Sequence, residues 1–238
     1  MLSDRFICRT SEKSDGNMAF RFGSADEVLF SRRHFLSPYG IELKNLAVMQ
    51  VEYGERIVMA DEHLCGTGAF KEPGVLAEAL MTKEKNLFLF LPTADCLPVA
   101  YCDPVQEVIA LAHLGWKPTM KRVAPKVIQR LSKDCGTKPE DILVSIGPGI
   151  HKESYRFANP MQKDLPEWKP FLHDLPGGDT EVDLVGFNVA ELVRAGVLES
   201  NIEVSPFDTA KSPDFFSHYR SVRTGEPEGR FATVLGMR

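Results

Sequence analysis

The stretches TADCLP at residues 93–98 and AHLGW at residues 112–116 place a cysteine and a histidine at the ends of two neighbouring apolar runs. The runs are short and rich in Leu, Val and Ala, which is typical of buried strands. Asp-Pro at residues 103–104 is a turn signal between them. Antiparallel pairing across this turn brings Cys96 and His113 to the same end of a hairpin. A thiol and an imidazole placed together can ligate a metal or act as nucleophile and base.

The composition is that of an ordinary globular chain. It has 238 residues, of which 43% are hydrophobic and 26% charged, and the net charge of -5 argues against nucleic acid as a partner. No apolar run approaches the roughly 18 residues of a membrane span, and residues 1–6 lack the pattern of a secretion signal. Five cysteines at scattered spacings do not form a disulfide framework. We therefore expect a cytoplasmic protein with no membrane partner, and we find no signal for an oligomeric state.

Two helices are predicted from apolar residues at helical spacing, over residues 120–134 and 184–195. Pro125 fits the first of them if that helix begins near residue 124, and Gly136 is a stop signal. Strands are expected at residues 46–51 and 56–59 (paired as a hairpin), 86–91, 142–146, 202–204 and 230–235. Residues 21–34 indicate short strands and turns, and residues 74–82 a short helix or turn. These elements indicate one α+β domain over residues 1–238.

Asp95, Cys96 and His113 are the leading candidates for chemistry. A cysteine taken alone is most often a packing residue, because cysteine is among the most buried residue types. An aspartate between two apolar runs, however, needs a hydrogen-bond partner or a chemical role. Finding Asp95, Cys96 and His113 at one hairpin end is harder to explain by packing. Glu52 is a further candidate at the end of a strand, where a carboxylate is usually just solvated.

Candidate binding residues lie further along the chain. Arg220 and Tyr219 belong to a polar group that is either a surface hydrogen-bond network or a site for an anion such as phosphate. Gly147 opens a Gly-Pro-Gly turn after a strand and is a candidate binder of phosphate or ribose. No glycine-rich nucleotide loop is present, which excludes cofactor binding of that type.

Several of these motifs together resemble the laccase-domain family. Its members are called multicopper polyphenol oxidoreductases or, in other cases, purine nucleoside phosphorylases. The resemblance extends from about residue 50 to the end of the chain. It rests on ADCLP at residues 94–98, HLGW at 113–116, IGPGI at 146–150, FSHYR at 216–220 and GR at 229–230.

This resemblance implies a fold, a site and an activity. The implied fold is an α/β sandwich with a mixed sheet flanked by helices, grouped with cysteine-hydrolase-like proteins. The implied site is a zinc bound by two histidines and a cysteine, with Cys96 and His113 at two of these positions. The implied activities are phosphorolysis of purine nucleosides and deamination of adenosine. Copper is less expected, because six scattered histidines do not supply a multicopper centre.

The chain departs from the family pattern at the first histidine. The usual Gln-Val-His motif ends here in Glu52. Because a carboxylate can bind zinc, the expected metal ligands become Glu52, Cys96 and His113. Two further departures are Lys117 after the tryptophan, where arginine is usual, and Glu78, where aspartate is usual.

Three hypotheses about function follow. In the first, the chain is a purine nucleoside phosphorylase or adenosine deaminase whose partners are nucleoside and phosphate. In the second, it is a metal-free hydrolase with Cys96 as nucleophile and His113 as base, the latter oriented by Asp95. In the third, it is a non-catalytic divergent homologue, because Glu52 replaces the motif histidine.

Overall fold

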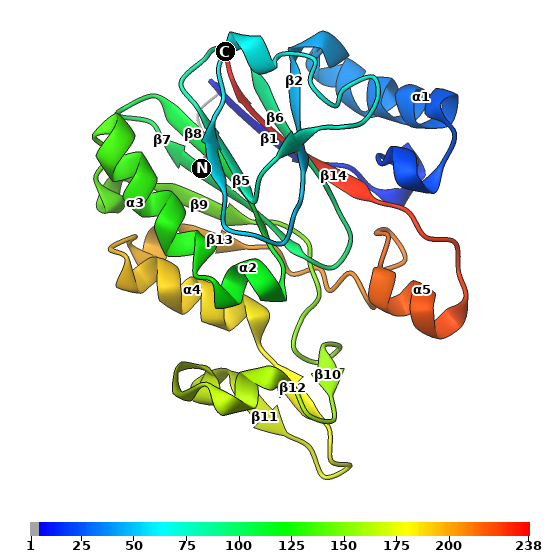
Figure 1. Cartoon of the computed structure of the whole chain (residues 1–238), viewed down its shortest axis with the longest axis vertical. Helices are drawn as coiled ribbons and strands as arrows, with labels where there is room; N and C mark the ends of the chain where they lie inside the picture. Colours follow the sequence, from blue (N-terminus) through cyan, green and yellow to red (C-terminus); the bar gives the residue numbers. More distant parts are fainter. Residues whose placement is uncertain (1–4) are drawn as a thin grey trace.

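The chain folds as two β-sheets packed face to face, with helices on the outer faces (Figure 1). This computed structural model describes residues 5–238. Residues 1–4, part of the stretch inspected for a secretion signal, lie outside the described residues. Within the described residues, no helix has the length and apolar character needed to cross a membrane. The α/β sandwich implied by the family resemblance is confirmed.

The first sheet joins the two ends of the chain. Its spatial order is β1, β14, β6, β2, β4, with antiparallel pairing of the first three strands and parallel pairing of the others. The C-terminal strand therefore lies between the N-terminal strand and the centre of the sheet. The strand bounds are β1 Phe6–Thr10, β14 Phe231–Met237, β6 Phe88–Thr93, β2 Leu46–Gln50 and β4 Val75–Leu76.

The second sheet contains the expected hairpin at its centre. Its spatial order is β13, β9, β7, β8, β5, β3. Leu97 pairs with Leu114 and Pro98 with His113, so the predicted antiparallel register is confirmed. The strand bounds are β13 Ile202–Val204, β9 Leu143–Ile146, β7 Leu97–Asp103, β8 Val108–Leu114, β5 Ala79–Thr82 and β3 Ile57–Met59.

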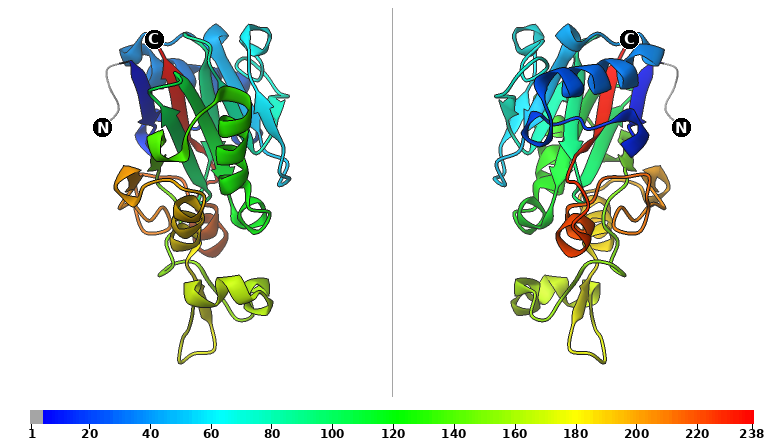
Figure 2. Two further views of the ribbon diagram at one scale, coloured as in Figure 1. Left: turned by 90° about the vertical axis from the view of Figure 1, so that its left-hand side faces the viewer. Right: turned by 90° about the vertical axis from the view of Figure 1, so that its right-hand side faces the viewer.

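Helices cover the two outer faces. Figure 2 shows α1 (Ala25–Leu36) and α3 (Val123–Cys135) on opposite sides of the sandwich. The predicted helices are confirmed as α3 and as α4 (Leu184–Arg194), and Gly136 ends α3 in the left-handed conformation. Two further helices are shorter. Helix α2 (Trp116–Met120) follows β8, and helix α5 (His218–Thr224) precedes β14.

Three apolar layers hold the sandwich together. One lies under α1, a second lies between the sheets, and a third lies between the second sheet and α3 with α4. Full burial of a Val, Leu or Ile side chain stabilises a fold by roughly 1.5–3 kcal/mol. The hairpin that carries Cys96 and His113 is packed on both faces and is therefore a rigid base for a site.

A small lobe extends beyond one end of the sandwich (Figures 1 and 2). It is built on a three-stranded antiparallel sheet of β10 (Arg156–Phe157), β12 (Thr180–Val182) and β11 (Leu172–Asp174). Trp168 of the lobe stacks on Phe187 of α4, with ring centroids 3.8 Å apart. This buried stack fixes the lobe to the sandwich.

Three local predictions are wrong. Strands β2 and β3 do not form a hairpin, because the chain between them crosses from one sheet to the other. Residues 25–36 are helical, since Ser24 and Glu27 form a reciprocal capping box that signals a helix start. Residues 74–82 contain β4 and β5, because pairing with neighbouring strands outweighs local preference.

Candidate active site

Cys96 and His113 flank one glycine at the mouth of the β7–β8 hairpin. A Cβ atom added to Gly115 would lie 2.7 Å from Sγ of Cys96 and 3.5 Å from Nε2 of His113. Only a residue without a side chain leaves this space open. The sulfur and the ring nitrogen therefore face the same small volume, as the hairpin register predicts.

Glu78 holds the imidazole from its other side. It directly precedes β5, the strand that pairs with β8, and its carboxylate is fully buried. Nδ1 of His113 donates to Oε2 of Glu78 at 2.6 Å, while Oε1 accepts the backbone N–H groups of Glu52 and Gly54, each at 3.0 Å. These bonds fix the carboxylate, which in turn fixes the ring. In the sequence, Glu78 stands out only as a departure from the family pattern, and its position between two alanines in an apolar segment is the signal of its role.

The charge on His113 follows from its surroundings. Burial lowers its pKa, but Cys96 and Glu78 together outweigh burial and raise the pKa to about 9. The imidazole is therefore cationic at neutral pH, and the ring of Tyr53 lies edge-on to it with centroids 6.0 Å apart. Cysteine, histidine and a carboxylate in this order form the arrangement of an activated nucleophile, its base and the group that orients the base.

Glu52 does not complete a metal site with Cys96 and His113. Its carboxylate points to Arg56, at 3.8 Å, and is partly exposed. Among residues 5–238, no three His, Cys, Asp or Glu side chains are grouped so that they could hold a metal ion. Zinc sites in proteins use three or four protein ligands, and here only Cys96 and His113 converge. The expected ligand set therefore does not fit zinc in this geometry.

Asp95 has a different role from the one expected. Its Oδ1 accepts the hydroxyl of Thr209 and its Oδ2 accepts the backbone N–H of Tyr219, each at 2.7 Å. The prediction that Asp95 orients His113 is wrong, because Glu78 does so. Asp95 instead ties the hairpin mouth to the start of α5.

Arg220 holds the C-terminal segment together. Its guanidinium donates to Glu226 and to the carbonyl oxygens of Thr209, Ser212 and Phe215 at 2.5–2.8 Å. Anion binding by Arg220 stays a prediction, and a ligand there would have to displace bonds that shape the loop. An arginine surrounded by backbone carbonyls cannot be distinguished in sequence from one that faces a ligand.

Gly147 and Tyr219 also make structural contacts. A Cβ on Gly147 would lie 2.9 Å from the ring of Pro98, so the glycine permits close packing there. The N–H of Tyr219 binds Asp95, and the guanidinium of Arg223 lies 3.3 Å from the centre of the Tyr219 ring. Substrate binding by these two residues stays a prediction.

A pocket with aromatic walls lies near the Cys96–His113 pair, although neither of these residues lines it. It has a volume of about 350 Å³, and Trp116, the residue after Gly115, forms part of its wall. Burial and the nearby Cys96 and Asp95 raise the pKa of the Tyr155 hydroxyl, another wall residue. No sequence motif predicts this pocket, because the lobe supplies most of its lining. Its lining consists of Trp116, Tyr155, Phe157, Asn159, Pro160, Met161 and Gln162.

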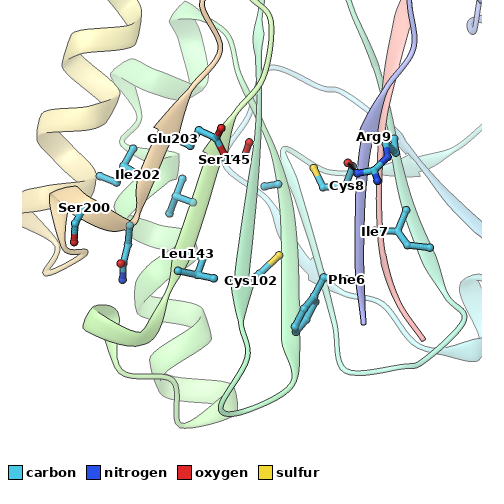
Figure 3. Close-up of a pocket in the computed structure, with 13 residues that line it drawn as sticks. Phe6, Ile7, Cys8, Arg9, Cys102, Leu143, Ser145, Ser200, Ile202 and Glu203 are labelled. Carbon is cyan, nitrogen blue, oxygen red and sulfur yellow. Dashed lines mark hydrogen bonds between the residues drawn. The ribbon is translucent and has the colours of Figure 1, made fainter. Parts of the chain in front are cut away.

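A larger cavity, of about 530 Å³, lies elsewhere, between edge strands β1 and β13 (Figure 3). Cys8 and Cys102 contribute its two thiols, and none of its lining residues is a histidine. Burial raises the pKa of Cys8 to about 11 and that of Cys102 well above its usual value. Both thiols are therefore protonated at neutral pH, and this cavity does not carry cysteine chemistry.

The fold and the site define a class: an α/β sandwich with a Cys–His–carboxylate cluster at the mouth of its central hairpin. Residues 8–238 match the family described as multi-copper polyphenol oxidoreductase laccase. The chain belongs to this family, and the resemblance drawn from its motifs is confirmed.

Relatives with assigned names cover most of the chain. A purine nucleoside phosphorylase of Deinococcus radiodurans is 33% identical over 93% of this chain and 81% of its own length. Purine nucleoside phosphorylase YlmD of Bacillus subtilis is 27% identical over 89% of this chain and 78% of its own. Adenosine deaminase RL5, from an unknown prokaryotic organism, is 26% identical over 87% and 81%.

Solved structures show the same fold. YlmD of Geobacillus stearothermophilus superposes with a TM-score of 0.87 at 27% identity, covering 99% of this chain and 93% of that one. The hypothetical protein YfiH of Bacillus licheniformis superposes with a TM-score of 0.88 at 25% identity, covering 98% and 93%.

Proposed function

We propose that this protein is an enzyme that cleaves purine nucleosides by phosphorolysis at the Cys96–His113–Glu78 site. One observation carries the proposal: a buried, cationic His113 is fixed by Glu78, faces Cys96 and lies near a pocket with aromatic walls. Perturbed ionisable groups beside a pocket are typical of catalytic sites. The names of the relatives supply the substrate class.

In this reaction His113 protonates the departing purine. A phosphate oxygen attacks C1′ of the ribose while the bond from C1′ to the purine nitrogen breaks. The departing purine keeps the bonding electrons and takes up a proton. A cationic imidazole can supply that proton as a general acid, and Glu78 keeps the ring oriented while it does so. No step passes through a metal, because the side chains present do not converge as a zinc site.

A second candidate is hydrolytic chemistry at the same residues. The order cysteine, histidine and carboxylate favours it, since this is the arrangement that cysteine hydrolases use. Here the sulfur of Cys96 attacks an electrophilic carbon and His113 protonates the leaving group. Water then displaces the enzyme sulfur and regenerates the thiol. Glu78, rather than Asp95, is the group that orients the base.

One assay separates these candidates. The purified protein is incubated with adenosine, with and without phosphate, after EDTA treatment and again after addition of zinc. Adenine that forms only with phosphate supports phosphorolysis, and inosine that forms without phosphate supports hydrolytic deamination. Cys96→Ala should abolish either product, whereas Cys65→Ala, at an exposed cysteine outside the site, should not.

The same assay tests the non-catalytic alternative. If the unaltered protein forms no product in any condition and Cys96→Ala is indistinguishable from it, the proposal fails. Glu52→His would then show whether restoring the motif histidine restores activity. Elemental analysis of the protein before EDTA treatment reports whether a metal accompanies it.

A further inference from the structure

Gln162 is a buried polar side chain in the wall of the aromatic pocket. The residue lies in the turn Met161–Asp164 of the lobe and is only 4% exposed. Its backbone carbonyl accepts the N–H of Leu165, but its amide takes part in none of the side-chain hydrogen bonds among residues 5–238. The amide is nevertheless not among the fully enclosed unpaired polar atoms of the described residues, so it is open to the pocket that Gln162 lines. A ligand in the pocket can therefore pair with it.

The other walls of the pocket suit a flat aromatic ligand. Trp116, Tyr155 and Phe157 line it, and the rings of Tyr155 and Phe157 meet edge to face at 4.7 Å. Nucleic-acid bases stack on such side chains irrespective of their identity, because every base has an aromatic face. The ring walls therefore hold a base without distinguishing one base from another, and a polar group is needed to do so.

An amide can supply that discrimination because it carries a donor and an acceptor side by side. The edge of a 6-aminopurine presents an amino donor beside a ring acceptor. A 6-oxopurine presents a carbonyl acceptor beside a ring N–H donor. Glutamine pairs with either edge through two hydrogen bonds, once its amide is turned to match.

We propose that Gln162 binds the six-position edge of the purine and is the residue that admits both 6-amino and 6-oxo bases. This inference rests on the proposed action on purine nucleosides. Trp116 in the pocket wall directly follows Gly115, where Cys96 and His113 meet, so a base in this pocket lies near these two side chains. The reacting side chains then belong to the sandwich, and the residue that binds the base edge belongs to the lobe.

Gln162→Glu tests the assignment by removing the donor and keeping the acceptor. At pH 8 kcat/KM should fall about tenfold for both adenosine and inosine, because either base edge then sets one acceptor against the carboxylate. Gln162→Met, of similar length but apolar, should also lower kcat/KM for both nucleosides. Gln106→Glu, at the exposed far end of the hairpin, is the matched control and should leave both values unchanged. Circular dichroism confirms that each variant is folded.

A binding titration accompanies the kinetics. Adenine and hypoxanthine should quench the fluorescence of Trp116, while Trp168, buried against Phe187, gives a constant background. Active protein whose kcat/KM for adenosine or for inosine is unchanged in Gln162→Glu overturns the inference. If the protein turns over no nucleoside, the proposed phosphorolysis fails and the titration decides alone. Weaker binding of both bases in Gln162→Glu then supports the role of Gln162, and failure of both bases to bind the unaltered protein overturns it.

Discussion

The buried pair of Glu78 and His113 makes the stability of this protein depend on pH in a defined window. The pKa of His113 is about 9 in the folded protein, against 6.5 for an unperturbed histidine. Because the folded state binds the proton more tightly, His113 contributes its full stability below pH 6.5, and that contribution is lost as pH rises through 9. At about 1.4 kcal/mol per pKa unit, the loss is roughly 3 kcal/mol.

Glu78→Gln should remove part of this dependence, because Cys96 is the larger cause of the raised pKa of His113 and Glu78 the second. Glutamine keeps the shape of Glu78 and can still accept the N–H groups of Glu52 and Gly54, but it has no charge to stabilise the imidazolium. Cys96 remains beside the ring, so part of the effect persists. Between pH 6 and pH 9.5 the free energy of unfolding of the wild type should therefore fall by about 1 kcal/mol more than that of Glu78→Gln. Urea unfolding followed by circular dichroism, in buffer with EDTA, measures the difference.

A matched control isolates the buried carboxylate. Glu140→Gln changes an exposed glutamate and should follow the wild type. Buried thiols such as Cys8 also reduce stability above about pH 9, because the unfolded thiol ionises first, but they do so equally in all three proteins. Parallel pH profiles for the wild type and Glu78→Gln would refute the assignment of a raised pKa to this pair.

Three further predictions follow from the site and its supports. Iodoacetamide at pH 7.5 should label Cys96 and spare Cys8 and Cys102, whose pKa values burial raises; labelling of either buried thiol in the folded protein, seen by peptide mass spectrometry, would contradict this. Arg220→Met should lower the free energy of unfolding by about 3 kcal/mol, since four hydrogen bonds are lost; an unchanged urea midpoint with a raised KM for phosphate would instead support its anion-binding role. Gly115→Ala should displace the sulfur of Cys96, because the new Cβ atom would lie 2.7 Å from it. Turnover should fall at least about tenfold with little change in the urea midpoint of unfolding. Unaltered turnover would show that the position of this sulfur is not needed.

The sequence predicted the hairpin and its pair of residues because the information is local. Two apolar runs joined by a short turn can pair in few registers, and a one-residue slip would move every side chain to the other face. Counting from the turn was enough to place Cys96 beside His113. The same holds for α3, whose apolar stripe and following Gly136 mark both its face and its end.

The sequence was less informative about which strands pair with each other. Residues 46–51 and 56–59 have the pattern of a hairpin, yet they belong to different sheets. Strand β2 pairs with β6, and strand β3 pairs with β5. The polar side chains near the site show the same limit. Asp95 is a residue type suited to chemistry, but its hydrogen bonds come from Thr209 and Tyr219, far along the chain. Arg220 and Glu52 are occupied by partners close in sequence, and only the folded loops show which way these side chains point.

The sequence by itself determined the family, the sandwich and the meeting of Cys96 with His113, since all three are carried by contiguous motifs and by one short hairpin. The tertiary structure alone decided what surrounds that pair. It brought Glu78 to His113 through the pairing of β5 with β8, and it turned the carboxylate of Glu52 away. It also brought Gln162 of the lobe into one pocket with Trp116. These contacts join residues far apart in the chain, and such contacts depend on how sheets and loops pack rather than on any local pattern.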